Sequence, residues 1–209
     1  MWLILLLVSA YLLGSVPTSI IAGKVFRGID IREHGSRNPG ATNTFRVLGW
    51  KIGVAVGLVD ILKGFAAVVC LPLLIPLDPW LSEELRRILA GFAAVAGHVW
   101  TVFAGFRGGK GVGAAFGVFL GLAPLPSLIA AAVWAALTFG TGYVSLGSIA
   151  AAVALPVSVI ALGLRRGDLS VPMAVLSTII GLLVIVRHKS NIVRLFRGEE
   201  NRFGKRGRK

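Results

Sequence analysis

The sequence predicts an all-α integral membrane protein with about seven transmembrane helices. Of its 209 residues, 56% are hydrophobic and the mean hydropathy is +0.82, whereas soluble domains are about 45–50% apolar. The apolar residues gather in runs of about twenty, the length of a membrane-spanning helix rather than of a spanning strand. Lipid cannot hydrogen-bond a backbone, so spans are helices or closed barrels, and the run lengths favour helices. The runs cover residues 2–22, 52–76, 85–104, 112–124, 126–140, 144–164 and 170–187.

The first run carries no charge before Lys24. A secretory signal peptide has a basic stretch ahead of its apolar core, and no such stretch precedes this run. We therefore expect residues 2–22 to remain as a span rather than to be cleaved.

The fourth and fifth runs are short, and only the segment APLP lies between them. They form either two tilted helices or a re-entrant pair. Prolines stand near the expected ends or kinks of the later runs, where a missing N–H costs least. These prolines are Pro124, Pro126, Pro156 and Pro172.

Seven spans place the two chain ends on opposite sides of the membrane, and Lys and Arg are enriched in cytoplasmic loops. With the C-terminus in the cytoplasm, seventeen of the 22 basic residues lie inside. The outside keeps only Arg86, Arg87, Arg165 and Arg166. We therefore expect the N-terminus outside. The polar segments at 33–46, 106–111, 141–148 and 187–202 then reach the cytoplasmic face, which predicts one site there, built from several helix ends.

The balance of charges is strongly basic, with a net charge of +13. In a soluble protein such a charge suggests nucleic acid, but basic cytoplasmic loops explain it here, and we expect no nucleic-acid partner. The single cysteine, Cys70, excludes a disulfide within the chain. Because no linker divides the sequence, we expect one domain over residues 1–203 and a basic cytoplasmic tail at 204–209.

The segment GSRNPGATNTFR, residues 35–46, combines glycines, amides, hydroxyls and arginines. Glycines permit positive φ and a close backbone approach to a ligand, and successive N–H groups around them form anion nests. A helix that starts near Thr42 would direct its positive end at such a nest. The pattern favours an anion site over a hydrated connection. Its candidate ligands are Ser36, Asn38, Gly40, Thr42, Asn43, Thr44, Arg37 and Arg46.

The segment GGKG, residues 108–111, fails the phosphate-loop pattern, because Ala104 stands six residues before Lys110 and Gly111 replaces the magnesium-binding hydroxyl. What remains is a lysine among glycines at the start of the fourth run, where a helix N-terminus adds positive potential. Alone, the segment is either a basic turn or a phosphate site. Beside the first segment it favours the phosphate site, with Gly108, Gly109 and Lys110 as ligands.

The segment RHKSNIVRLFRGEENR, residues 187–202, follows the last run. His188 and Asn191 are three residues apart and would share one helix face, where that span meets the cytoplasm. We interpret them as site residues, although the segment also resembles an amphipathic tail that lies on anionic lipid.

Asp60 and Lys63 lie one turn apart inside the second run. Charges within a membrane are functional candidates, but an Asp–Lys pair also neutralises itself, so the two either line the site or brace it. We expect His98 to be a core histidine. No cluster of Cys, His and Asp has metal-ligand spacing, and we expect no metal.

Three segments together resemble one family: GSVPTSIIAGKVFRGIDIREHGSRNPGATNTFRVLG, then GHVWTVFAGFRGGKGV, then RHKSNIVRLFRGEE. In this order and spacing they are similar to the bacterial acyl-phosphate:glycerol-3-phosphate acyltransferases, which are integral membrane enzymes with seven spans. The resemblance covers nearly the whole chain.

The resemblance implies an acyltransferase of phospholipid synthesis in the bacterial plasma (inner) membrane. Such an enzyme transfers a fatty acyl group from acyl phosphate to the 1-hydroxyl of glycerol 3-phosphate, and releases lysophosphatidic acid and phosphate. The implied partners are the two substrates, membrane lipid and the upstream enzyme that forms acyl phosphate, with no cofactor. Carried over by motif, Ser36, Arg46 and Lys110 hold phosphate, His188 and Asn191 lie near the reacting centre, and Ser145 and Ser148 also match. Arg37 stands where the family often has a small residue.

The implied chemistry agrees with the residues. Acyl phosphate is already activated, so no covalent enzyme intermediate is needed, and no G-x-S-x-G nucleophile elbow is present. Two groups remain as the base that removes the hydroxyl proton. One is His188, since imidazole titrates near neutral pH. The other is the phosphate of glycerol 3-phosphate, whose second pKa is about 6, with Asn191 orienting the hydroxyl. We favour the second, because the segments have few side chains that can accept a proton at neutral pH.

A transporter of phosphate or an organic phosphate is the rival interpretation. Transporters bind near the membrane midplane, often between repeated halves. This sequence has no internal repeat, and its polar segments are expected on one face, so we favour the enzyme.

Overall fold

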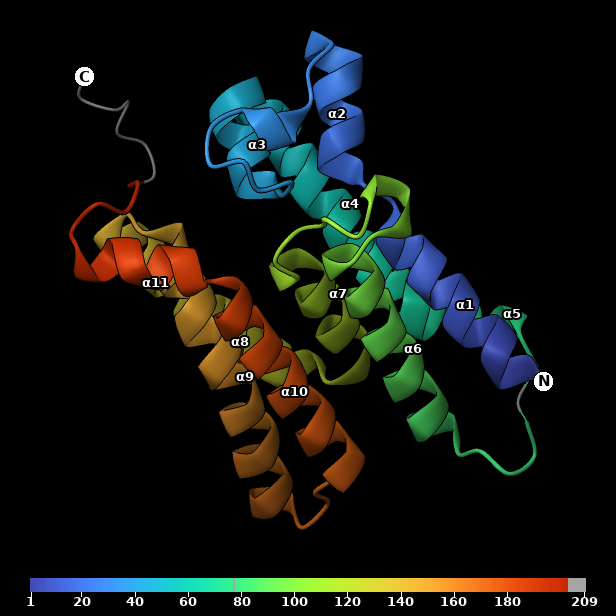
Figure 1. Cartoon of the computed structure of the whole chain (residues 1–209). Coiled ribbons are helices and arrows are strands. Elements are labelled where there is room, and N and C mark those ends of the chain that lie inside the picture. Colours follow the sequence, from blue (N-terminus) through green and yellow to red (C-terminus); the bar gives the residue numbers. More distant parts are fainter. Residues whose placement is uncertain (77, 203–209) are drawn as a thin grey trace. The chain divides into compact units, whose positions relative to one another are not determined.

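The structure, a computed structural model, describes residues 1–76 and 78–202. Every regular element in these ranges is a helix (Figure 1). The chain divides into two compact units, an N-terminal unit of residues Met1–Leu122 and a C-terminal unit that begins at Ala123, and each is described by itself. The tail expected at 204–209 lies outside the described residues, and the single domain over 1–203 stays a prediction.

The N-terminal unit contains the first four apolar runs and the two glycine-rich segments. Its α-helices and 3₁₀ helices are α1 (Trp2–Ser15), α2 (Thr18–Arg27), η1 (Ile31–Glu33), α3 (Ala41–Leu48), α4 (Trp50–Val69), α5 (Leu71–Leu74), α6 (Glu83–Val99), η2 (Val102–Ala104) and α7 (Val112–Leu122). Within this unit, α1 packs on α6, and α4 packs on α3, α6 and α7.

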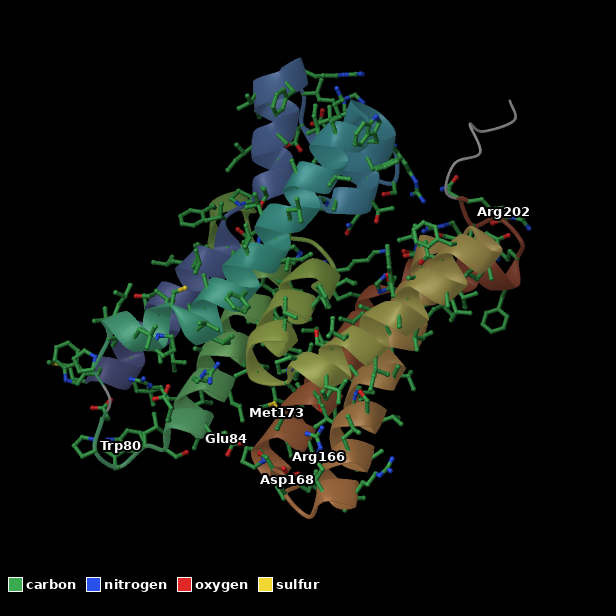
Figure 2. All side chains as sticks on the ribbon, turned by 180° about the vertical axis from the view of Figure 1, so that it is seen from behind. Trp80, Glu84, Arg166, Asp168, Met173 and Arg202 are labelled. Carbon is green, nitrogen blue, oxygen red and sulfur yellow. The ribbon has the colours of Figure 1, made fainter. Side chains whose placement is uncertain are left out.

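The C-terminal unit contains the last three runs, in which α9 packs on both α8 and α10. Its helices are α8 (Pro124–Thr141), α9 (Val144–Arg166), α10 (Val171–Arg187) and α11 (Lys189–Phe196). Arg166 and Asp168 mark the α9–α10 connection, and Arg202 lies at the opposite end of this unit (Figure 2). The end that carries Arg202 also holds α11.

Five helical segments of the described chain are long and apolar enough to cross a membrane, and α10 with α11 counts as a sixth that is bent by 57°. α7 has only 11 residues, so it rises about 17 Å, little more than half of a hydrocarbon core of about 30 Å. Large apolar side chains remain exposed along the spans, such as Leu62 and Leu182, as lipid-facing residues do. The all-α membrane fold is confirmed, whereas the side on which each end lies stays a prediction.

Glycines permit the close helix contacts of the N-terminal unit. A Cβ at Gly14 of α1 would overlap the carbonyl oxygen of Ala94 in α6, and one at Gly64 of α4 would overlap that of Ala114 in α7. Membrane helices gain little from apolar burial against one another, because lipid is as apolar as they are, so small residues that allow backbone approach favour association.

The first run is broken in the middle, between the end of α1 at Ser15 and the start of α2 at Thr18. Pro17 has no N–H to donate, and the carbonyls before it lose their helical partners. Side chains replace these partners: Lys63 Nζ donates to the Val16 carbonyl at 3.0 Å, and Thr101 Oγ1 donates to the Ser15 carbonyl. The break is thus stabilised inside the protein, as irregular backbone at membrane depth must be.

Candidate active site

The predicted site residues are divided between the two units. The N-terminal unit holds Ser36, Asn38, Gly40, Thr42, Asn43, Arg46, Gly108, Gly109 and Lys110, and the C-terminal unit holds Ser145, Ser148, His188 and Asn191.

Asn43 fastens the loop that precedes α3. Its Oδ1 accepts from the N–H of Ser36 at 2.8 Å, and its Nδ2 donates to the carbonyls of Ile31 and His34 at 3.2 and 3.0 Å. A Cβ at Gly35 would overlap Oδ1 of Asn43, and Gly35 has a positive φ of 59°. Asn43 is only 1% exposed, so its side chain shapes the loop that carries Ser36. A direct contact of Asn43 with phosphate stays a prediction.

The helix expected near Thr42 begins at Ala41, as α3, with Gly40 as its N-cap. The Gly40 carbonyl accepts from the N–H of Thr44 and from its hydroxyl, at 3.0 and 3.1 Å. Helix N-termini carry partial positive charge and N–H groups without helical partners. Thr42 and Arg46 are four residues apart and therefore share a face of α3, and the exposed Arg46 adds a full charge there.

The turn between η2 and α7 carries Lys110, which is half-buried. The N–H of Gly108 donates to the Val99 carbonyl, and that of Gly109 donates to the His98 carbonyl, both at 3.1 Å. These N–H groups are therefore engaged with the end of α6. What the two glycines clearly supply is close packing of the turn beside His98, directly before Lys110.

Arg32 of η1 connects the chain just before the first glycine-rich segment with η2, just before this turn. Its guanidinium donates to Asp30 at 2.7 Å and to the Ala104 carbonyl at 3.1 Å. The hydrogen bonds from Arg32 lower the pKa of Asp30 to about 2, so the carboxylate stays charged at neutral pH. The residues of η1 and η2 are thereby held together within one unit.

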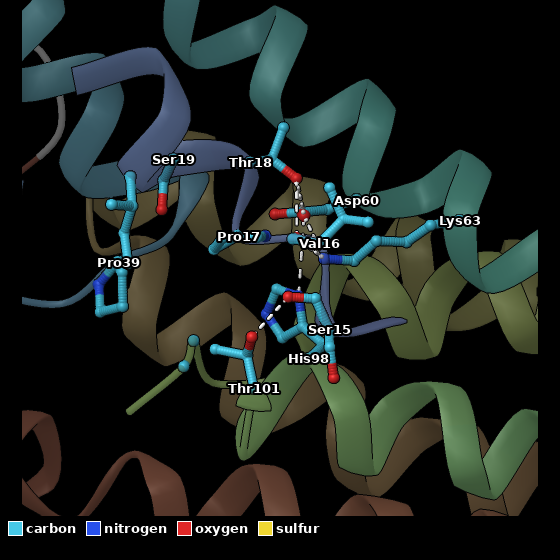
Figure 3. A pocket seen from close by; sticks show the side chains of 13 residues that line it. Ser15, Val16, Pro17, Thr18, Ser19, Pro39, Asp60, Lys63, His98 and Thr101 are labelled. Carbon is cyan, nitrogen blue, oxygen red and sulfur yellow. Dashed lines mark hydrogen bonds and ion pairs between the residues drawn. The ribbon is translucent and has the colours of Figure 1, made fainter. Parts of the chain in front are cut away.

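A buried charge cluster of Asp60, Lys63 and His98 lines a pocket of the N-terminal unit (Figure 3). Oδ1 of Asp60 lies 2.9 Å from Lys63 Nζ, accepts from Thr18 Oγ1 at 3.0 Å, and lies 3.6 Å from His98 Nδ1. These residues line a small pocket. Pro39, Gly108 and Gly109 also line it. The Asp60–Lys63 pair braces the break in the first run, through the bond from Lys63 to the Val16 carbonyl, and it also lines this pocket. That the pair lines the functional site stays a prediction.

In the C-terminal unit a carboxylate that the sequence did not single out organises the polar residues. Oε1 of Glu200 accepts from Ser145 Oγ at 3.0 Å and from Asn191 Nδ2 at 2.7 Å. Oε2 accepts from Arg194 Nε at 2.7 Å. Glu200 is buried, although it belongs to an otherwise basic segment. An acidic residue in such a segment was the available signal, but which hydrogen-bond donors it meets depends on the fold.

His188 lies at the bend between α10 and α11 and is buried. Its Nδ1 is 2.7 Å from the Val184 carbonyl. A carbonyl oxygen can only accept, so Nδ1 carries the proton, and in the neutral imidazole Nε2 carries the lone pair. Ser148 Oγ donates to the Val144 carbonyl one turn earlier, as hydroxyls inside helices often do. The structure thus groups Ser145 and Asn191 around Glu200 and does not show Ser148 in that group.

Comparison with known proteins shows the family of the chain. The model of a family described as glycerol-3-phosphate acyltransferase matches residues 4–198. The chain is 44% identical to the glycerol-3-phosphate acyltransferase of Chlorobaculum parvum, over 94% of this chain and 95% of that protein. It is 42% identical to that of Chlorobium chlorochromatii, over 97% and 98% of the two chains.

Solved structures extend the similarity to the fold. The crystal structure of PlsY (YgiH), an integral membrane glycerol 3-phosphate acyltransferase, in its glycerol 3-phosphate form is 36% identical with a TM-score of 0.84, over 97% of this chain and 96% of that one. Its lysophosphatidic acid form gives the same identity and TM-score, over 97% and 95%. The resemblance inferred from the three segments is confirmed: the protein is an integral membrane acyltransferase and belongs to the glycerol-3-phosphate acyltransferase family.

Proposed function

We propose that the protein transfers a fatty acyl group from acyl phosphate directly to the 1-hydroxyl of glycerol 3-phosphate, and so forms lysophosphatidic acid and inorganic phosphate. One observation carries the proposal most directly. Nearly the whole chain is similar to a solved acyltransferase whose structures include a glycerol 3-phosphate form and a lysophosphatidic acid form. Substrate and product of this reaction are thus both bound by a protein of the same fold.

Both substrates carry phosphate, so two anions must be held. Ser36, Arg46 and Lys110 are assigned to this task, with the start of α3 adding positive potential. The other candidate phosphate contacts are Asn38, Gly40, Thr42, Asn43, Gly108, Gly109, Ser145 and Ser148. The net charge of +13 favours the entry of such substrates.

The transfer proceeds in one displacement. The 1-hydroxyl oxygen of glycerol 3-phosphate attacks the acyl carbon, the bond from that carbon to the phosphate oxygen breaks, and phosphate leaves with the bonding electrons. Asn191, whose Nδ2 is fixed by Glu200, presents its carbonyl oxygen to orient the hydroxyl. The proton passes either to the substrate's own phosphate, which we favour, or to Nε2 of His188.

The same proposal includes a location. We place the protein in the bacterial plasma membrane, with the N-terminus outside and the site at the cytoplasmic face, where the upstream enzyme that forms acyl phosphate can supply the donor.

The orientation is tested with a thiol reagent that does not cross the membrane, on single-cysteine variants in which Cys70 is replaced by serine. Asp168→Cys should be labelled in intact cells, and Arg197→Cys only after the membrane is opened. The reverse pattern would overturn the orientation.

The decisive experiment uses purified protein in detergent or lipid. Glycerol 3-phosphate is supplied with palmitoyl phosphate or, separately, with palmitoyl-CoA, and phosphate release and lysophosphatidate are both measured. Turnover with palmitoyl phosphate alone, abolished by Arg46→Ala or Lys110→Ala, is the expected result. Turnover with palmitoyl-CoA alone would overturn the donor, and no turnover with either donor in folded protein would favour the transporter.

A further inference from the structure

The imidazole of His98 lies directly against the turn that carries Lys110. A Cβ built at Gly109 would overlap Nε2 of His98, and the two ring carbons beside Nε2 are the next atoms it would meet. Gly109 also donates its N–H to the His98 carbonyl at 3.1 Å. Gly109 is therefore in contact with both the backbone and the side chain of His98.

The opposite side of the imidazole faces Asp60. His98 Nδ1 lies 3.6 Å from Asp60 Oδ1, too long for a normal hydrogen bond, but both side chains are buried and in direct contact. Asp60 is itself fixed by Lys63 and by the hydroxyl of Thr18. The imidazole is thus enclosed between a fixed carboxylate and the backbone of Gly109.

We propose that Asp60 and His98 are positioning residues: the buried pair fixes the imidazole against Gly109, and thereby sets the conformation in which the turn presents Lys110 to a substrate phosphate. The inference rests on the proposed function, in which Lys110 binds phosphate. It gives this buried cluster a task in the reaction besides bracing the broken first span.

Stability alone does not account for the cluster. Taking charges out of water is costly, and a buried ion pair is often no more stabilising than well-packed apolar residues of the same volume. Lys63 Nζ adds a hydrogen bond to the Val16 carbonyl at the break, which also accepts from the N–H of Thr18, and Asp60 compensates the charge of Lys63. The placement of His98 between Asp60 and Gly109 serves neither task, whereas it limits where the turn can lie.

The contact can be tested by substituting both partners. Gly109→Ala should displace the turn and raise the KM for the phosphate-bearing substrates by about 10- to 100-fold, as misplacements of about 1 Å do. Combining it with His98→Ala removes the atoms that the new methyl group would meet. We therefore expect the double variant to match His98→Ala alone. Simple addition of the two losses would overturn the proposal.

Gly108→Ala is the matched control. A Cβ at Gly108 would overlap the carbonyl oxygen of His98 rather than its ring, so His98→Ala should not rescue it. Equal rescue at both positions would mean that His98→Ala merely loosens the turn, and would overturn the specific contact.

A second experiment tests Asp60. Asp60→Asn keeps the shape of the side chain but weakens its contact with the imidazole, so the imidazole can move away from a methyl group at position 109. Gly109→Ala should then raise KM less than in the parent protein, and an unchanged effect would overturn the role of Asp60.

Every variant is also followed by its thermal midpoint, with and without glycerol 3-phosphate. If the unmodified protein turns over and the cycle is additive, the positioning role fails while the function stands. If the unmodified protein shows no turnover, the proposed function fails. The midpoints then still report whether His98 and Gly109 are coupled, and additive midpoints overturn the contact itself.

Discussion

Nδ2 of Asn191 donates a hydrogen bond of 2.7 Å to Oε1 of Glu200. The carboxylate can only accept, so this contact defines which way the amide faces and leaves its carbonyl oxygen on the other side. Arg194 holds the second carboxylate oxygen at 2.7 Å. The orientation of the proposed hydroxyl-binding amide therefore depends on Glu200.

Glu200→Gln should lower kcat by about 10- to 100-fold, because a buried charge-assisted hydrogen bond contributes about 1.5–3 kcal/mol. The neutral amide holds Arg194 weakly and can present its NH₂ group to Asn191. Steady-state kinetics with palmitoyl phosphate measure the loss. Glu199→Gln is the control, since Glu199 is exposed and the change in charge is the same. Equal effects of the two substitutions would show that only the charge of the segment matters.

The helical spans were predictable, because the length of an apolar run in lipid leaves few alternatives. All seven runs are helical in the structure. The break at Val16 and Pro17 was not predicted, because its stabilising partners, Lys63 and Thr101, stand far along the chain. Pro156 lies inside α9, where a kink rather than a helix end stays a prediction. Local sequence shows where a helix can break, but the side chains that hydrogen-bond to the exposed carbonyls at the break come from distant parts of the chain.

The site was predictable as segments but not as contacts. The start of α3 follows from glycine and hydroxyl patterns that act within a few residues. The grouping of Asn191, Ser145 and Glu200 requires the chain after α11 to return to α9, and sequence spacing carries no such information. The hydrogen bonds of the Asn43 side chain to the loop backbone were also not predicted. An asparagine amide can bind either a ligand or a backbone group, and the sequence does not show which of the two it meets.

Asn43→Asp should destabilise the loop that precedes α3. The new carboxylate can still accept from Ser36, but it cannot donate to the carbonyls of Ile31 and His34. An unmet buried group costs about 1–3 kcal/mol, which lowers the thermal midpoint by about 2–10 °C in a chain of this size. Asn38→Asp makes the same change in the same loop and should leave the midpoint nearly unaltered. If both variants melt alike, Asn43 is not the residue that fastens the loop.

Arg37→Gly should leave turnover intact. Arg37 has a positive φ of 59°, which costs a residue with a side chain about 1–2 kcal/mol, while glycine's extra freedom in the unfolded chain offsets about 0.5–1 kcal/mol. We therefore expect an unchanged or slightly raised thermal midpoint and an unchanged KM. An increase in the KM for either substrate would assign Arg37 a direct contact with phosphate.

The Asp30–Arg32 pair predicts a small acid sensitivity. The pKa of Asp30 is lowered to about 2 from 3.8, chiefly by its hydrogen bond with Arg32, so the pair stabilises the fold above about pH 4. That contribution is lost as the pH falls through about 2. Asp30→Asn should reduce the drop in thermal midpoint between pH 4 and pH 2. The effect is small because Arg32 is 34% exposed and solvent screens the pair. Asp168→Asn, at an exposed position, is the control, and identical profiles would contradict the prediction.

Two substitutions of His188 separate the possible bases. Asparagine can replace the Nδ1–H that donates to the Val184 carbonyl but offers nothing at Nε2, whereas glutamine reaches the Nε2 position and loses that donor. Neither is basic. If the substrate phosphate takes the proton, His188→Asn should keep kcat within about tenfold of the parent. If His188 is the base, both variants should lose about 10²–10⁴-fold in kcat with the KM for glycerol 3-phosphate unchanged. That second outcome would overturn the substrate-assisted step.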